Sequence, residues 1–295
     1  MTDVLQFTLG REDFRWIGQD LSRPECVVAE RDGTLWVSDD RAAMTRIAAD
    51  GTQTLIGAMK ALPNGLAMAA DGSFYIANIG DGRLWQVTRD GGETVILDAI
   101  DGQSLGSLNF SYVDARGRLW ITVSTLTEPR VKAVNEAIPD GFIALVENGR
   151  GRIVLDGLCF TNEIRIDAAE RWMYIVETAR ARILRAPLDA NGMPGAPDVF
   201  GPERLAEDAK PDGCALDADG NLWVTDVGGH RIWVINPEGK AHIVFADPSG
   251  EFLTRPASIT FAGPDLRTAL IGSLVLKRLA AFDAPVPGAP MSHWR

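Results

Sequence analysis

The sequence predicts an all-β protein, a six-bladed β-propeller with four-stranded antiparallel blades. A polar residue recurs at intervals of 39 to 53 residues, and in five copies an aromatic residue or methionine follows it eleven positions later. An alternating apolar run and a turn lie between the two, as in a β-hairpin. A period of this length is expected of propeller blades. The pairs are Glu25 with Trp36, Asn64 with Tyr75, Asn109 with Trp120, Asn162 with Met173 and Asp212 with Trp223.

The turn inside each copy supports this interpretation, because a tight hairpin needs a residue that tolerates positive φ. A sixth, weaker copy starts at Pro256-Ala257-Ser258 and carries a two-residue insertion. Six copies predict six blades in a single domain over residues 1–295. The turn pairs are Asp32-Gly33, Asp71-Gly72, Arg116-Gly117 and Asp219-Gly220, with Glu170-Arg171 as the one pair that lacks glycine.

Further apolar runs separated by turns follow within each copy, so each blade is expected to add strands outward from the axis. Residues 187–202, rich in Pro, Gly and Ala, are expected to be a surface connection. In chain order the expected strands are 33–38, 45–48 and 54–56; 73–77, 82–87 and 94–97; 119–123 and 141–146; 172–176 and 182–186; 231–235 and 242–245; 259–261, 268–272 and 279–282.

Three segments fall outside the repeat. Residues 4–9 are a strand candidate within the N-terminal segment 1–19, which we expect to join the last blade and close the ring, so that no edge stays open. Residues 125–139 form an insertion longer than an ordinary hairpin loop. It is either a lid or wall beside a substrate, or a solvated loop without a ligand role. The Pro-rich tail 285–295 is expected to be a surface strap.

Composition excludes several classes of function. The formal net charge of −11 and the lack of a Lys/Arg cluster oppose nucleic-acid binding. Neither a signal peptide nor a membrane span is recognisable, which predicts a cytoplasmic protein. Cys26, Cys159 and Cys214 form an odd set without metal-ligand spacing, so a disulfide framework or thiolate zinc site is not expected. The expected partner is a small-molecule substrate, and no oligomeric state is predicted.

The recurring polar position predicts a ring of side chains around the axis, because equivalent residues of a propeller converge there. Two buried carboxylates beside three carboxamides are costly without a cation. Oxygen ligands suit Ca²⁺ or Mg²⁺, although Mn²⁺ or Zn²⁺ could also bind. Four side chains leave coordination sites for water and substrate, as metal-assisted hydrolysis requires. The ring comprises Glu25, Asn64, Asn109, Asn162, Asp212 and then Ala257 or Ser258.

From about residue 20 to residue 284, these motifs resemble the senescence-marker-protein/gluconolactonase (regucalcin-like) family of six-bladed propeller lactonases. The resemblance implies a divalent ion held by Glu25, Asn162 and Asp212, with Asn109 as a further ligand or substrate contact. It also implies that Asp212 serves as base or water activator. Two positions depart from the pattern: Ser107 replaces an arginine that holds substrate hydroxyls in sugar-lactone members, and Glu163 stands where the family often has glycine.

Our main hypothesis is therefore a divalent-metal-dependent lactonase, with Ca²⁺ favoured. The metal ligands are Glu25, Asn109, Asn162 and Asp212, and Asp212 is also the catalytic residue. Asn64, Asn109 and Glu163 are weaker candidates for substrate contact. The alternatives are a non-catalytic propeller that binds a ligand or protein, a metal-dependent esterase or phosphotriesterase, and a structural ion in an inactive protein. Trp36, Trp120 and Trp223 are expected in the blade core, and His230 in a surface turn.

Overall fold

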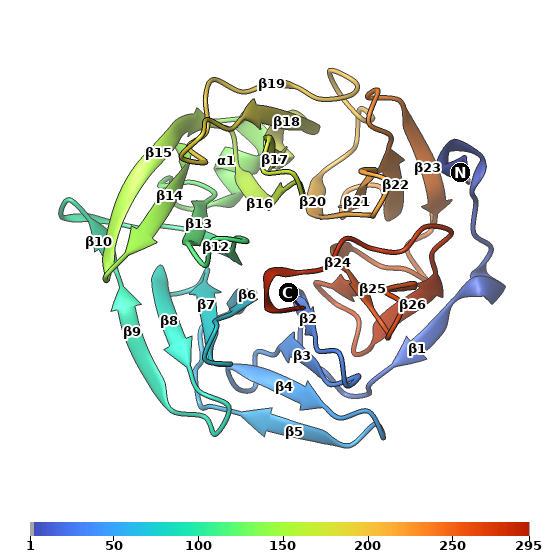
Figure 1. Ribbon diagram of the computed structural model, residues 1–295, viewed down its shortest axis with the longest axis horizontal. Coiled ribbons are helices and arrows are strands. Elements are labelled where there is room, and N and C mark those ends of the chain that lie inside the picture. Colours follow the sequence, from blue (N-terminus) through green and yellow to red (C-terminus); the bar gives the residue numbers. More distant parts are fainter. Residues whose placement is uncertain (1–2, 295) are drawn as a thin grey trace.

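The structure is a computed structural model that describes residues 3–294. Six four-stranded antiparallel sheets surround a central axis as the blades of a propeller (Figure 1). The predicted fold class is confirmed. From blade one to blade six, the innermost strands are β2 (Val27–Ala29), β6 (Pro63–Met68), β12 (Leu108–Val113), β16 (Thr161–Ile166), β20 (Pro211–Leu216) and β24 (Pro256–Ala262).

The outer strands follow in chain order, and the expected runs match them with small differences at the ends. The second strands are β3 (Leu35–Ser38), β7 (Phe74–Asn78), β13 (Leu119–Val123), β17 (Trp172–Glu177), β21 (Leu222–Asp226) and β25 (Thr268–Ser273). The third strands are β4 (Met44–Ile47), β8 (Arg83–Val87), β14 (Gly141–Glu147), β18 (Arg182–Pro187), β22 (Arg231–Ile235) and β26 (Leu279–Asp283). The fourth strands are β5 (Gln53–Ile56), β9 (Glu93–Leu97), β15 (Arg150–Leu158), β19 (Asp198–Val199), β23 (Ala241–Ala246) and β1 (Arg15–Ile17).

The prediction of a strand at residues 4–9 was wrong. Val4–Gln6 is a 3-10 helix, and the strand that pairs with β26 is β1, at Arg15–Ile17. The earlier segment instead covers blade five, because its apolar side chains are buried there. Phe7 packs edge-on against Trp223, and the Leu9 N–H donates to the Val244 carbonyl.

Two short elements also differ from expectation. Residues 187–202 were expected to be a connection only, yet they contain β19, which pairs with β18 as the outer strand of blade four. A two-stranded hairpin, β10 (Ala99–Ile100) and β11 (Gln103–Ser104), was not predicted. Both elements have only two residues per strand, so they carry no alternation that a sequence pattern can reveal.

Each innermost strand of blades two to six loses its regular pairing at the recurring polar position. The ladder shifts register there, as it does at a β-bulge, and a bulge can turn a side chain away from the sheet. In blade one Glu25 precedes β2, and its N–H donates to Ser38 Oγ at 3.1 Å. The shifts fall between Pro63 and Leu66, Leu108 and Phe110, Thr161 and Ile164, Pro211 and Cys214, and Pro256 and Ile259.

Glycine after this position lets neighbouring blades approach closely. A Cβ on Gly213 would lie 2.4 Å from the Ala257 carbonyl oxygen and 2.5 Å from Ser258 Cα. We predict that Gly213→Ala lowers the free energy of unfolding by about 1–3 kcal/mol, because backbone atoms cannot yield as a flexible side chain can. Urea denaturation measures this, with Gly195→Ala as control, since its Cβ would meet no atom closer than 3.3 Å. Equal losses in the two variants would contradict the prediction.

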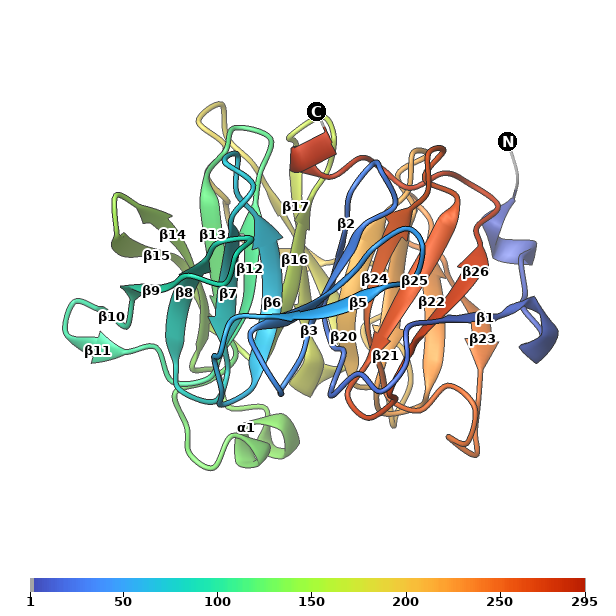
Figure 2. The same cartoon turned by 90° about the horizontal axis from the view of Figure 1, so that it is seen from below.

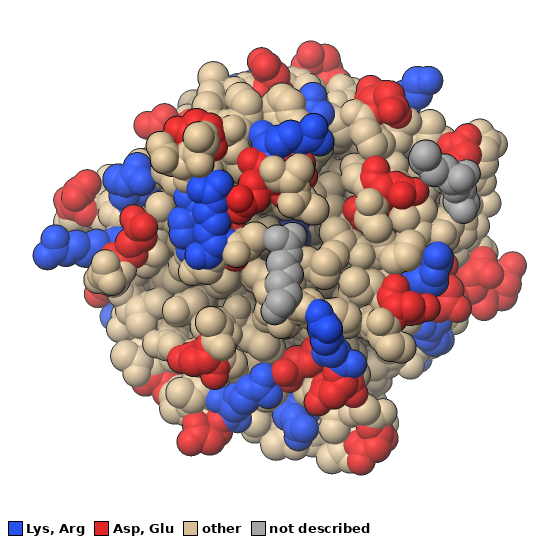
Figure 3. All heavy atoms as spheres, viewed as in Figure 1, with Lys and Arg blue, Asp and Glu red and all other residues tan. Residues whose placement is uncertain are grey.

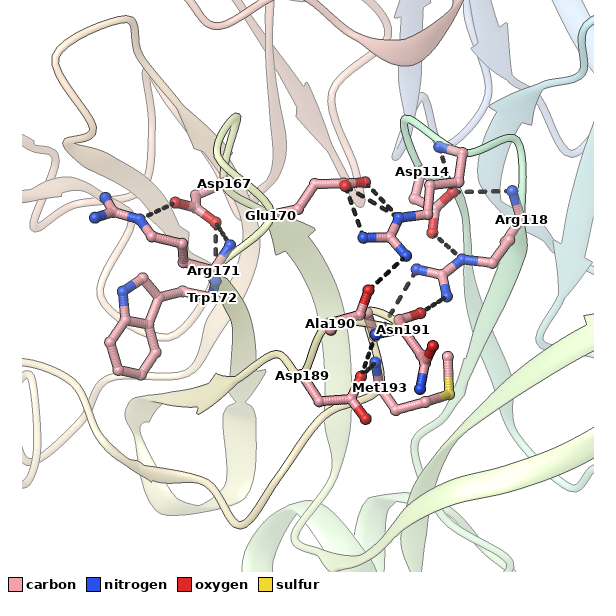
Figure 4. Close-up of polar contacts among 12 residues, drawn as sticks. Asp114, Arg118, Asp167, Glu170, Arg171, Trp172, Asp189, Ala190, Asn191 and Met193 are labelled. Carbon is pink, nitrogen blue, oxygen red and sulfur yellow. Dashed lines mark hydrogen bonds and ion pairs between the residues drawn. The ribbon is translucent and has the colours of Figure 1, made fainter.

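Blades three and four are joined by hydrogen bonds between their turns (Figure 4). Arg116 Nε donates to the Glu170 carboxylate at 3.0 Å, and Arg118 Nη1 donates to the Asn191 carbonyl at 2.7 Å. Glu170 holds the turn position that is glycine in other copies, with φ of 51°. Its side chain therefore makes an inter-blade contact that glycine could not make.

The two faces of the ring are closed differently. The C-terminal tail crosses one face, while helix α1 (Val131–Glu136) lies at the other (Figure 2). Trp294 is buried and its Nε1 donates to the Ala29 carbonyl, and the Ala289 N–H donates to the Leu216 carbonyl. Basic and acidic side chains are interspersed over this tail-covered face (Figure 3). The cavity described next lies on the α1 side.

Candidate metal centre and active site

The four predicted metal ligands line one cavity of about 410 Å³ near the axis. Three come from the inner strands of blades three, four and five, the fourth comes from the segment just before β2 in blade one, and each is at most 6% exposed. Rotation about the propeller axis brings them together from positions as far apart in sequence as Glu25 and Asp212. The four residues are Glu25, Asn109, Asn162 and Asp212.

Asn64 does not line this cavity. Its Nδ2 donates to the Asn109 carbonyl at 2.9 Å and to Asn109 Oδ1 at 3.2 Å, and its own Oδ1 accepts a hydrogen bond from Arg23 Nη2 at 2.7 Å. Asn64 thus orients two residues that do line the cavity, and its geometry does not support a direct substrate contact.

Glu163 also points elsewhere. It forms an ion pair with Arg165 at 2.7 Å and accepts the Cys214 N–H at 3.2 Å. Burial raises the pKa of Glu163 to about 7, although the Arg165 charge opposes the shift. Asn162 therefore lines the cavity, whereas Glu163 is engaged with Arg165 and Cys214.

One amide oxygen in the cavity has no hydrogen-bond donor. Asn162 Nδ2 donates to Thr178 Oγ1 at 3.2 Å, and that hydroxyl donates to the Pro211 carbonyl at 2.6 Å. These bonds orient the amide, while Asn162 Oδ1 is buried and accepts nothing from the described residues. A buried acceptor of this kind is costly unless a ligand satisfies it.

The environment disfavours the charged forms of both cavity carboxylates, Glu25 and Asp212. Burial raises the pKa of Asp212 well above its ordinary value, and the negative charges of Glu25 and Glu163 add to the effect. Burial likewise raises the pKa of Glu25, against the nearby Arg23 charge. Arg23 forms an ion pair with Glu25 Oε2, but this oxygen accepts no hydrogen bond of good geometry within the described residues. One guanidinium therefore compensates only part of the negative charge.

These residues fit a hard divalent cation. Two carboxylates and two amides supply the oxygen donors that such an ion prefers, and in the described part of the chain Asn162 Oδ1 has no hydrogen-bond partner. Within residues 3–294 no group of three or more His, Cys, Asp or Glu side chains is gathered to hold a metal. The fit consequently depends on the asparagines.

The insertion at 125–139 forms part of the cavity wall. Arg130, Val131, Val134 and Asn135 line the cavity, and the Val134 carbonyl accepts a hydrogen bond from Lys210 Nζ at 3.0 Å. Asp140 closes the base of the insertion by accepting from the hydroxyls of Thr125 and Thr127. This anchoring favours a substrate wall over a free solvated loop.

Sequence reasoning missed the four basic residues of this cavity, of which Arg130 lies in the insertion. The other three stand two positions before the ring residue in blades one, five and six, so the repeat spacing could have revealed them. Ser107 occupies the same position in blade three, where it is 1% exposed and outside the cavity lining. The three basic residues at this repeat position are Arg23, Lys210 and Arg255.

The cysteines and His230 do not supply a nucleophile to the cavity. All three cysteines are buried and free. Burial raises the pKa of the Cys214 thiol to about 12, which opposes thiolate formation. His230 Nδ1 accepts the Arg255 backbone N–H at 2.9 Å. This hydrogen bond gives His230 a structural role, because it fixes the backbone of Arg255, which lines the cavity.

Residues 23–275 match the family model described as the SMP-30/gluconolactonase/LRE-like region. The chain belongs to this family. Its relatives include a 6-deoxy-6-sulfogluconolactonase of Pseudomonas putida, 27% identical over 63% of this chain and 61% of that protein. A gluconolactonase of Zymomonas mobilis is 27% identical over 60% of this chain and 52% of that protein. The matched region thus spans between half and two thirds of these relatives' length.

Solved structures of other proteins share the fold. A gluconolactonase from Xanthomonas campestris has a TM-score of 0.75 at 19% identity, covering 98% of this chain and 94% of that one. A calcium-binding protein, regucalcin, from Agrobacterium tumefaciens has a TM-score of 0.72 at 21% identity, covering 95% and 98%. In the described part of this SMP-30/gluconolactonase/LRE-like chain, no helix has the length and apolar character needed to cross a membrane.

Proposed function

We propose that this family member is a divalent-metal-dependent lactonase. The observation that carries the proposal is the convergence of Glu25, Asp212 and two asparagines on one buried cavity, where Asn162 Oδ1 finds no hydrogen-bond donor among residues 3–294. Relatives named as gluconolactonases and a sulfogluconolactonase support hydrolysis of a cyclic ester.

Glu25, Asn109, Asn162 and Asp212 would hold the ion. When bound, it would polarise the lactone carbonyl and lower the pKa of a water molecule. Ca²⁺ is the favoured ion, because the donors are all oxygens and a structural relative is described as calcium-binding. Mg²⁺, Mn²⁺ and Zn²⁺ are the alternatives.

Side chains of the protein would perform the other steps of the reaction. Asp212 would take the proton of the attacking water. Thr178 and Asn64 orient the amides of Asn162 and Asn109, so these oxygens need not reorganise during reaction. The α1 wall would limit the access of bulk water to the ester.

Two measurements test the proposal. Elemental analysis after dialysis detects a bound ion, and turnover is then measured on a panel of lactones, aryl esters and phosphotriesters with and without chelator. We expect one bound divalent ion per chain and turnover of lactones that chelator abolishes and the ion restores. Absence of both ion and turnover would indicate a non-catalytic ligand-binding propeller. An ion in an inert protein would indicate a structural role, and a preference for aryl esters or phosphotriesters would replace the lactonase assignment.

The metal should also stabilise the fold in a pH-dependent way. Glu25 and Asp212 have folded-state pKa values above their ordinary values of 4.5 and 3.8. Their protonated forms therefore favour the metal-free folded state, and this stability is lost as pH rises through the raised values. Because the ion binds the deprotonated forms, added Ca²⁺ should raise Tm more at about pH 8 than at about pH 5. At a hundredfold excess over Kd the stabilisation is about 2.7 kcal/mol.

Thermal denaturation of chelator-treated protein, with and without Ca²⁺ at the two pH values, measures this difference. Asp212→Asn serves as the matched control, because it removes one of the two carboxylates and should reduce the Ca²⁺-induced shift. A shift that is the same at both pH values, or larger at the lower one, would contradict the assignment of these carboxylates as ligands.

A further inference from the structure

The cavity mouth carries a local excess of positive charge in an acidic protein. The chain has 40 acidic and 29 basic residues, yet the cavity is lined by two acidic and four basic ones. Three basic residues occupy the same repeat position in blades five, six and one, which are adjacent in the ring. The fourth comes from the insertion of blade three. The four are Arg23, Arg130, Lys210 and Arg255.

These four cations differ in what they contact. Arg23 pairs with Glu25, and the Lys210 ammonium donates to the Val134 carbonyl. In contrast, the guanidinium groups of Arg130 and Arg255 make no ion pair or hydrogen bond with any residue in the described range 3–294. Several arginines elsewhere in the chain do pair with carboxylates, as Arg182 does with Glu177 at 2.6 Å.

Unpaired guanidinium groups at a cavity mouth are suited to an oxyanion. Arginine presents a planar set of donors that matches carboxylate, sulfonate or phosphate oxygens. The divalent ion proposed for the ring would neutralise the negative charges of Glu25 and Asp212. The basic residues of the cavity mouth would then have no counter-charge. A neutral sugar lactone has no group that would use this charge, whereas a lactone with an anionic substituent would.

We propose that the substrate is a lactone that carries a second, negatively charged oxyanion group, which Arg130 and Arg255 bind while the ester faces Asp212. This inference rests on the proposed lactonase function and specifies its substrate class. Neither arginine belongs to the predicted metal ligands, so each can be changed without removing a ligand of the ring. Rising ionic strength should weaken the preference for the anionic lactone, because the mouth is open to solvent.

The test compares gluconolactone with the same lactone in which the terminal hydroxymethyl group is oxidised to carboxylate, or in which its hydroxyl is replaced by sulfonate or esterified with phosphate. We expect kcat/KM to favour at least one anionic lactone by tenfold or more, and the three substituents show which oxyanion the mouth selects. Arg130→Gln and Arg255→Gln should each reduce the ratio of anionic to neutral kcat/KM by about tenfold to a hundredfold. Arg150→Gln is the charge-matched control, because this exposed residue begins β15 and pairs with Glu147 at the end of β14 away from the insertion. Equal kcat/KM for neutral and anionic lactones, or variants that slow both equally, would overturn the inference.

A binding measurement separates this inference from the lactonase proposal. Calorimetric titration compares the aldaric diacid with the aldonic monoacid, neither of which is turned over. The diacid should bind the wild-type protein at least tenfold more tightly, and Arg255→Gln should remove the difference while Arg150→Gln keeps it. If no lactone is hydrolysed but the diacid preference is found, the lactonase proposal fails and the anion site stands. If the diacid binds no more tightly, the anion site is excluded whatever the activity.

Discussion

Asp212→Asn is expected to lower kcat on a hydrolysed lactone by about a hundredfold to ten-thousandfold, the usual contribution of general acid–base catalysis. Asparagine has nearly the same shape, so the bulge that carries position 212 should persist. The variant nevertheless loses the proton acceptor and one negative charge. The metal-free fold should not be destabilised at neutral pH, because burial and two neighbouring carboxylates already disfavour the charged form of Asp212.

Steady-state kinetics on the wild type and variant, with circular dichroism to verify folding, measure this effect. Asp219→Asn is the control: it lies in the exposed turn of the same blade and removes the same charge. The control should keep wild-type kcat. A folded Asp212→Asn protein with full turnover would remove Asp212 from the role of base.

Trp223→Ala should lower the free energy of unfolding by about 3–5 kcal/mol, the range for a large aromatic residue removed from a packed core. Trp223 is fully buried and contacts Phe7 and Phe261 edge-on, each at a ring-centroid distance of 6.2 Å. Its Nε1 donates to Asp217 Oδ2 at 3.0 Å. The truncation therefore leaves a cavity among the N-terminal segment, blade five and blade six, and also removes a donor from a buried carboxylate.

Urea denaturation gives the difference in unfolding free energy. Trp172→Ala is the matched control, because Trp172 is only partly buried and stacks against Arg185 at 4.2 Å. The loss in this control should be clearly smaller. A cost below about 1 kcal/mol for Trp223→Ala would contradict its assignment to the core that joins the two blades.

The repeat allowed most of the fold to be predicted, since each blade is built from contacts that are local in sequence. The alternation of apolar residues marks the strands, and the turn residues mark the hairpins. Trp36, Trp120 and Trp223 are at most 1% exposed, in agreement with their prediction as blade core. The predictions at residues 4–9 and at β19 were wrong. These segments lie outside the repeat, so no recurring pattern indicated how they pair or pack.

In the candidate site, too, the repeat predicted some features and missed others. The ring position was predictable because rotation about an axis superimposes equivalent residues, and Glu25, Asn109, Asn162 and Asp212 do line one cavity. Asn64 was placed in the ring, but its side chain is engaged with Asn109 and Arg23.

The sequence by itself determined the six blades, their turns and the repeat position from which polar side chains converge, because these depend on neighbours within one blade. Only the tertiary structure decided that Glu163 turns to Arg165, that Arg15–Ile17 pairs with β26, and that α1 walls the cavity. Only it showed that Arg130 and Arg255 share the cavity mouth. These features arise from contacts between residues distant in sequence, whose energies depend on how other blades pack.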